Sequence, residues 1–176
     1  MIASISRDSQ QVLLERARRL AMPLGDGADA RVTMLAFTLG DEGFVTALAG
    51  LTEATPVSHL APLRNVPALY AGIANVRGAL IPVFDLRSVL NIHAPRADTL
   101  PIMLVIDTPQ PAGIWVDRLD GLLSVERATL RRDHGPQSAW FLGRTPDLRT
   151  AIDLRALLAA AIALQTNRPQ EASTRP

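Results

Sequence analysis

Short apolar runs alternate with turn-forming residues along most of the chain. The first predicted hairpin covers residues 32–48, where two runs rich in β-compatible apolar residues flank the polar turn 40–43. A second hairpin is predicted over residues 70–84, because Arg77 and Gly78 form a compact turn between two apolar runs. Further strands are expected at residues 102–106, 114–116 and 119–125. The pattern therefore predicts a mainly β fold built from many short strands.

Helical spacing appears near the two ends of the chain. Apolar residues recur at helical intervals over residues 8–21, which predicts an amphipathic helix within an N-terminal extension, residues 1–31, that ends in a linker. Residues 154–164 are apolar and rich in alanine, which predicts a short closing helix that packs on the body. Residues 165–176 are mostly polar and contain prolines, so a flexible tail is expected.

One sequence element occurs twice. Asp85-Leu86-Arg87, which follows an apolar strand, recurs 68 positions later as Asp153-Leu154-Arg155. A weaker likeness aligns residues 34–37 with 103–106, and residues 43–45 with 113–115. The repeats predict a duplicated fold made of two similar small barrels.

Composition excludes several classes of function. Eighteen basic and seventeen acidic side chains give a net charge of +1, which disfavours nucleic-acid binding. The chain has no cysteine, its three histidines His59, His93 and His134 are far apart in sequence, and no glycine-rich phosphate loop occurs. We therefore expect neither a metal site nor a cofactor. No apolar stretch approaches the ~20 residues of a membrane-spanning helix, so we expect a cytoplasmic protein without direct membrane insertion.

The duplication raises one enzymatic alternative. Two similar lobes could each donate a carboxylate to a hydrolytic dyad that shares one proton, and Asp85 and Asp153 are the candidates. Both residues, however, precede apparent helices, where aspartate commonly caps the first turn. Capping is the favoured interpretation, and the paired-aspartate hydrolase is kept as the alternative.

Two charged residues are placed for recognition. Arg77 lies in a tight turn, where its planar guanidinium could bind a carboxylate through two hydrogen bonds, although a solvated turn arginine is the simpler interpretation. Glu53 follows a strand-like run and is a possible partner. Spacing alone does not pair them.

A family resemblance rests on the run from Tyr70 to Leu90. Its Gly-Ile-Ala-Asn-Val-Arg-Gly and Pro-Val-Phe-Asp-Leu segments resemble the signature of CheW-like chemotaxis coupling domains. Residues 113–119 are similar to that family's Gly-x-x-Val-Asp-x-Val segment, and residues 151–158 to its closing Leu-Asp-x-x-x-Leu element. The resemblance covers about residues 32–164. It implies two SH3-like five-stranded barrels around a shared core, with lobes at roughly 32–95 and 100–158.

The resemblance also implies a function without catalysis. Members of this family are adaptors that join the cytoplasmic tip of a methyl-accepting chemoreceptor to a CheA-type histidine kinase, so recruitment to membrane-associated receptor arrays is expected. In the family, a glutamate and the arginine of the Asn-x-Arg-Gly turn are associated with a salt bridge and with coupling. The candidate partner-binding residues are Glu53, Asn75, Arg77, Gly78, Leu80, Ile81 and Val83. The long N-terminal extension and divergent second half are similar to the coupling protein of type IV pilus twitching motility.

Overall fold

The computed structural model describes residues 31–94, 102–131 and 138–166, and these form a mainly β protein. The strands are β1 (Arg31–Leu39), β2 (Glu42–Ala47), β3 (Leu51–Pro56), β4 (Leu60–Ala61), β5 (Tyr70–Val76), β6 (Ala79–Phe84), β7 (Ile102–Ile106), β8 (Ala112–Val116), β9 (Arg118–Glu126), β10 (Phe141–Arg144) and β11 (Thr150–Ile152). The helices are η1 (Leu48–Gly50), α2 (Arg87–Leu90), η2 (Arg127–Thr129) and α3 (Leu154–Thr166). Both predicted hairpins and the short closing helix are confirmed. The predicted N-terminal helix lies outside the described residues.

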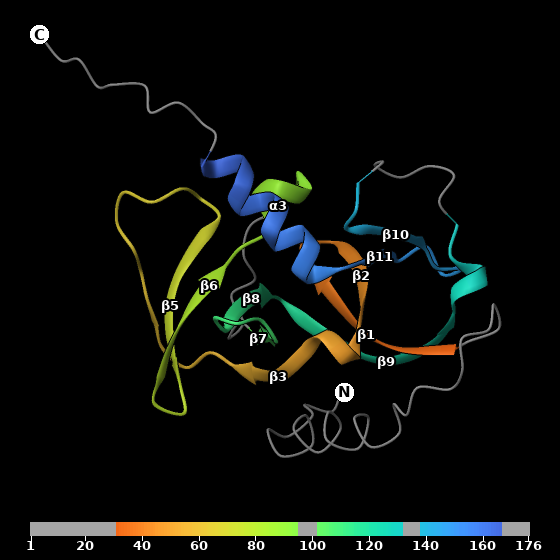
Figure 1. Ribbon diagram of the computed structural model, residues 1–176, viewed down its shortest axis with the longest axis horizontal. Coiled ribbons are helices and arrows are strands. Elements are labelled where there is room, and N and C mark those ends of the chain that lie inside the picture. Colours follow the sequence, from red (N-terminus) through yellow and green to blue (C-terminus); the bar gives the residue numbers. More distant parts are fainter. Residues whose placement is uncertain (1–30, 95–101, 132–137, 167–176) are drawn as a thin grey trace, which may run out of the picture.

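The strands form two sheets, and each sheet draws on both halves of the chain (Figure 1). The first sheet has the order β10-β11-β2-β1-β9, and the second has the order β3-β7-β8-β6-β5-β4. The hairpin β1–β2 therefore lies beside late strands, while the hairpin β7–β8 lies among early ones. The predicted lobes 32–95 and 100–158 do not describe this arrangement, because the two halves have exchanged hairpins. Local sequence patterns identify strands but not their partners.

Strand register shows that the sheets are two copies of one pattern. In one sheet β11 pairs parallel with β2, so that Ile152 faces Thr46; in the other β6 pairs parallel with β8, so that Phe84 faces Ile114. A bulge interrupts β3 at Thr52 and β9 at Asp120, which are again 68 positions apart. The duplication predicted from the Asp-Leu-Arg element therefore extends through the strands.

The register also corrects part of the sequence alignment. Val45 faces Ala151 in one sheet, and Gly113 faces Val83 in the other. Since Val83 and Ala151 are equivalent, Val45 corresponds to Gly113. The likeness of residues 43–45 to 113–115 was thus misaligned by two positions, because glycine and aromatic residues recur at nearby places in both hairpins.

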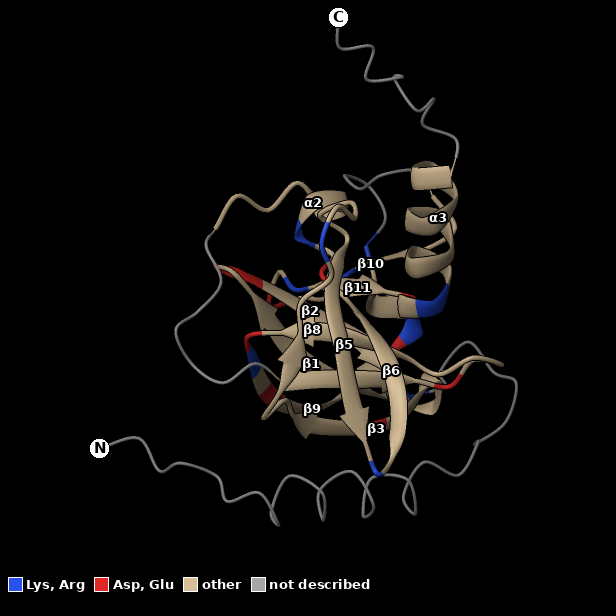
Figure 2. Ribbon diagram, turned by 90° about the vertical axis from the view of Figure 1, so that its left-hand side faces the viewer, with Lys and Arg blue, Asp and Glu red and all other residues tan. Residues whose placement is uncertain are grey.

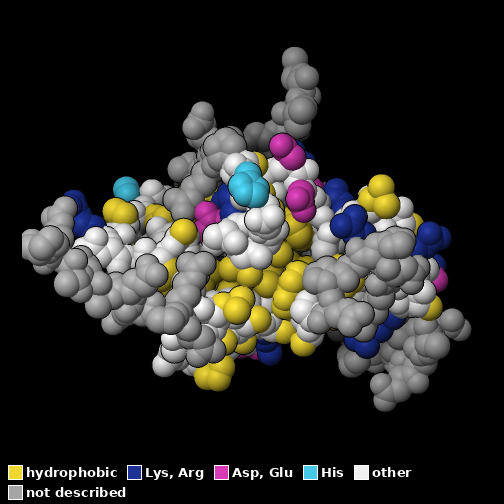
Figure 3. Space-filling model, turned by 90° about the horizontal axis from the view of Figure 1, so that it is seen from above, with side chains coloured by type: hydrophobic (Ala, Val, Ile, Leu, Met, Phe, Trp, Pro, Cys, Tyr) yellow, Lys and Arg dark blue, Asp and Glu magenta, His cyan; other side chains and the backbone are white. Residues whose placement is uncertain are grey.

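Three apolar clusters form the core of the described residues. The largest joins both sheets to α3 and contains the stacked rings of Phe37 and Phe44, whose centroids are 5.6 Å apart. A smaller cluster around Met103 and Trp115 lies within one sheet, and its counterpart around Met34 lies within the other. In Figure 1, α3 runs across the junction of the sheets, and Figure 3 shows hydrophobic side chains grouped near the centre of the face seen from above. Among the described helices, none is long and apolar enough to cross a membrane.

Candidate partner-binding site

The turn of the β5–β6 hairpin is a two-residue loop with an unusual backbone. Arg77 has φ of 52° and Gly78 has φ of 88°, and the loop closes with Val76 facing Ala79. Positive φ at both central residues is the mark of a type I′ turn, whose twist matches that of the flanking strands. The side-chain oxygen of Asn75 accepts a hydrogen bond from the backbone N–H of Gly78 at 2.9 Å. Asn75 and Gly78 therefore shape the turn that displays Arg77.

Arg77 and Glu53 form an ion pair on this surface. Nη2 of Arg77 lies 3.4 Å from Oε2 of Glu53, and the side chains are 67% and 17% exposed. Glu53 belongs to β3, at the opposite edge of the sheet from the β5–β4 edge, so the sheet curls enough for the hairpin tip to approach its far side (Figure 2). An exposed pair of this kind contributes only about 0.2–1 kcal/mol to stability. The exposed guanidinium of Arg77 remains available to a further hydrogen-bond acceptor.

Leu80 extends the site with an apolar side chain. It is 74% exposed, although it lies in a strand whose other large side chains are mostly buried. The exposed Ala79 links it to the turn. Arginine is enriched at protein interfaces, and Leu80 adds exposed apolar area beside it.

Ile81 and Val83 do not belong to this surface. Both are buried in the cluster around Trp115, because alternate residues of β6 point into the sheet's core. The candidate partner edge is corrected to Leu80 alone from this strand. The geometry brings together Glu53, Asn75, Arg77, Gly78 and Leu80.

The first Asp-Leu-Arg element forms a buried charge cluster that the sequence did not reveal. Nη1 of Arg87 donates to both carboxylate oxygens of Asp85 at 3.1 and 3.0 Å, and its Nη2 donates to Asp117. Asp117 also accepts the backbone N–H of Gly40 at 2.7 Å. Burial alone would raise the pKa of Asp117, but the bonds from Arg87 and Gly40 outweigh it and lower the pKa. The cluster ties α2 to the turns that follow β1 and β8.

The second Asp-Leu-Arg element has a different environment. The Asp153 carboxylate accepts the backbone N–H groups of Arg155 and Ala156 at 2.9 and 3.1 Å, which confirms capping of α3. Asp85 accepts the backbone N–H of Arg87, yet the first residue outside α2 is Leu86, and the main partner of Asp85 is the Arg87 guanidinium. Each carboxylate thus has cationic or amide donors of its own, which is unlike a dyad that shares a proton.

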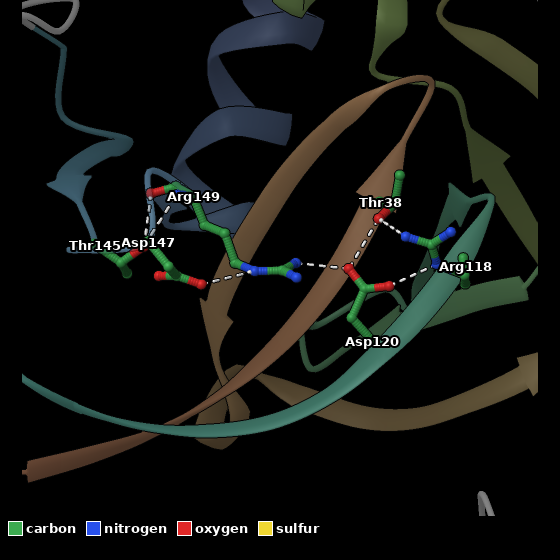
Figure 4. A network of polar contacts seen from close by, with 6 residues as sticks. All are labelled: Thr38, Arg118, Asp120, Thr145, Asp147 and Arg149. Carbon is green, nitrogen blue, oxygen red and sulfur yellow. Dashed lines mark hydrogen bonds and ion pairs between the residues drawn. The ribbon is translucent and has the colours of Figure 1, made fainter.

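A second polar network lies at the edge of the other sheet (Figure 4). Asp120, the bulged residue of β9, accepts hydrogen bonds from Arg149 at 2.6 Å, Arg118 at 2.7 Å and Thr38 at 2.8 Å. Burial would raise the pKa of Asp120, but these three donors lower it overall. Asp147 joins the network through Arg149. The network fastens the turn before β11 to β1 and β9.

Comparisons with known proteins agree on one family. The family model described as the CheW-like domain matches residues 33–160. Chemotaxis protein CheW of Rhizobium meliloti is 26% identical over 93 residues, which cover 52% of this chain and 60% of the relative. Chemotaxis protein CheW of Klebsiella aerogenes is 28% identical over 98 residues, with 55% and 59% covered.

Protein PilI of Pseudomonas aeruginosa is 29% identical over 111 residues, which cover 61% of this chain and 62% of that protein. The matches span about three fifths of the length of these curated relatives. The crystal structure of the scaffolding protein TtCheW from Thermoanaerobacter tengcongensis aligns with a TM-score of 0.63 at 20% identity, covering 73% of this chain and 88% of that one. This structural likeness supports the fold.

Proposed function

Because this chain belongs to the CheW-like domain family, we propose that it is a non-enzymatic adaptor that couples a methyl-accepting chemoreceptor to a CheA-type histidine kinase. Such an adaptor needs binding surfaces rather than reactive groups. The family match over residues 33–160 supports the adaptor class, and the relatives named for chemotaxis support the signalling role. We further propose that the protein acts in the cytoplasm and is recruited to membrane-associated receptor arrays by its partners.

The observation that carries the proposal is the displayed ion pair at the hairpin tip. Arg77 is held away from the core by a rigid turn, is positioned by Glu53 and has Leu80 beside it. A partner carboxylate can bind the exposed guanidinium, and a partner apolar side chain can cover Leu80. Charge gives orientation and specificity to such a contact, while apolar area contributes affinity. We propose this tip as a contact surface for the receptor or the kinase.

Reversal of the charge at Arg77 tests the role of the tip. In Arg77→Glu the new carboxylate faces Glu53 and repels it. The same carboxylate would also repel a partner carboxylate that binds Arg77 in the native chain. We expect at least a tenfold weaker assembly when the purified variant is co-sedimented with the source organism's chemoreceptor membranes and CheA-type kinase. Arg144→Glu, an exposed change in the other sheet, is the matched control and should assemble normally. Unchanged co-sedimentation of Arg77→Glu would contradict the proposed contact.

The output of the pathway is a separate part of the proposal. We propose control of type IV pilus twitching motility, because the match to Protein PilI spans more of this chain than the matches to chemotaxis protein CheW and has similar identity. Identification of the kinase captured by the chain from its source cell tests this output. Capture of a kinase encoded with pilus genes would support it, and capture of a flagellar kinase would contradict it.

A further inference from the structure

The sheet that contains β1 and β2 surrounds a cavity of about 510 Å³. Its walls come from β1, β2, η1, the start of β3, β9, η2, β10, β11 and the start of α3. Apolar side chains dominate the lining, including Met34, Leu51, Val125, Leu142 and Ile152, and Arg127 and Arg155 also line it. Volumes of this size are typical of sites that take a ligand or an inserted side chain. Of the lining residues, only Leu51 belongs to the sheet that carries Arg77, so the cavity lies mainly against the other sheet.

The duplicated half of the molecule shows what normally fills this position. By the strand register, Ala47 of β2 corresponds to Trp115 of β8, since Met34 faces Ala47 and Met103 faces Trp115. Trp115 is buried in the apolar cluster of its own sheet, whereas Ala47 lines the cavity. The cavity therefore lies where the other copy places an indole. Replacement of a large ring by a methyl group at an equivalent position accounts for part of the hollow.

The two copies also differ in the charged residues beside this position. Arg155 is the counterpart of Arg87, and Ala49 is the counterpart of Asp117 in the same register. The Arg87 side chain is 8% exposed and bonded to Asp117, whereas the Arg155 side chain is 46% exposed and has only a long contact, 3.5 Å, with exposed Asp107. A Cβ at Gly50 would lie 3.8 Å from Nε of Arg155, so the guanidinium passes beside η1. The carboxylate that one copy supplies internally is missing from the other.

We propose that this cavity binds a segment of a protein partner that presents an aromatic side chain next to a carboxylate. The aromatic side chain enters the space that Trp115 fills in the other copy, and the carboxylate pairs with Arg155 as Asp117 pairs with Arg87. Two arginines, Arg127 and Arg155, line the cavity against one acidic residue, Asp153, whose carboxylate already caps α3. This balance of charge favours an acidic segment over a basic one. The proposal goes beyond the adaptor function and does not depend on it, because it concerns a second surface away from Arg77.

A short peptide that reproduces the filled copy provides the probe. Acetyl-Gly-Trp-Val-Asp-Gly-amide carries the Trp-Val-Asp sequence of residues 115–117, and NMR titration into the full chain reports where it binds. We expect saturable shifts centred on Met34, Val125 and Leu142. The same peptide with Asn in place of Asp should bind at least fivefold more weakly. Absence of saturable shifts, shifts centred elsewhere, or equal binding of both peptides would overturn the proposal.

Two substitutions in the chain test the internal comparison. Ala47→Trp should fill the cavity and reduce peptide binding at least tenfold, and Ala49→Asp should give Arg155 an internal partner and weaken binding at least fivefold. Ala49→Asn has nearly the same shape without the charge and is the control for the second change. If Ala47→Trp does not fold, the comparison of Ala49→Asp with Ala49→Asn decides alone, and equal binding by these two would count against the site. Nuclear Overhauser effects from residues 1–30 to Met34 in the free chain would assign the cavity to the chain's own N-terminal segment and would also overturn it.

Discussion

Single residues show how similar motifs acquire different roles in this molecule. Arg77, Arg87 and Arg155 are all arginines beside an acidic group, yet one is displayed, one is buried and one lines a cavity. Arginine suits each position because its guanidinium stays charged and offers five donors. The exposure of the guanidinium decides whether the pair is structural or available for recognition.

Arg77 combines a backbone cost with a functional contact. A non-glycine residue at positive φ costs roughly 1–2 kcal/mol, and the exposed pair with Glu53 returns about 0.2–1 kcal/mol. In Arg77→Gly the relief of strain is offset by the lost ion pair and by the greater conformational entropy of glycine in the unfolded chain, about 0.5–1 kcal/mol. The free energy of unfolding should therefore change by less than ~1 kcal/mol. Urea denaturation measures this change. A loss of several kcal/mol would show that Arg77 is mainly structural.

Arg87 and Arg155 form a matched pair for a stability test. Arg87→Met leaves the carboxylates of Asp85 and Asp117 without their buried cation, so we expect a loss of about 3–5 kcal/mol. Arg155→Met removes only an exposed contact and should cost less than ~0.5 kcal/mol. Similar losses for both variants in urea denaturation would contradict the conclusion that Arg87 stabilises the fold and Arg155 does not.

Secondary-structure elements explain where the two copies diverge. The β5–β6 hairpin extends well beyond the bulge after Tyr70, whereas β10 and β11 are short and their hairpin has no equivalent tip. The glycines Gly72 and Gly143 follow the bulges in both copies with φ of 153° and 135°. Within the described residues, the first copy alone therefore places an arginine, Arg77, at the centre of a two-residue hairpin turn. A partner that recognises this arginine should therefore bind the first copy of the repeat and not the second.

The Asp120 network makes the joining of β1, β9 and the turn before β11 dependent on pH. The pKa of Asp120 is lowered in the folded state, so its contribution to stability is complete above the unfolded-state pKa of about 3.9 and is lost as pH falls through the lower folded-state value. In Asp120→Asn this contribution is absent at every pH. Urea denaturation between neutral and acidic pH should show a smaller decrease of stability for Asp120→Asn than for the native chain. Parallel decreases of stability in the two chains would show that the Asp120 carboxylate does not stabilise the fold in this way.

At the scale of the whole molecule, the sequence predicted most strands but not their assembly. Alternation and the Arg77-Gly78 turn located the β5–β6 hairpin at its observed bounds, and the Asp-Leu-Arg element revealed the duplication. β10 and β11 were missed because, at four and three residues, they are too short to show alternation. The exchange of hairpins between sheets depends on contacts between distant residues, and no local pattern encodes them.

The candidate site was predicted in part. The turn and its arginine were visible in the sequence, while the approach of Glu53 depends on the curl of the sheet. Leu80, Ile81 and Val83 looked alike as apolar strand residues, and only the packing separated the exposed Leu80 from the two buried side chains. The role of Asp117 was hidden because its partner, Arg87, lies 30 positions earlier in the chain.

The proposed adaptor role requires this protein to bridge a chemoreceptor and a CheA-type kinase. The most direct measurement is co-sedimentation of the source organism's CheA-type kinase with chemoreceptor-bearing membranes, with and without the purified chain. We expect the kinase to enter the pellet in quantity only when the chain is present, and the chain to enter with it. Equal sedimentation of the kinase without the chain, or exclusion of the chain from a pellet that contains both partners, would show that the chain is not the adaptor between them.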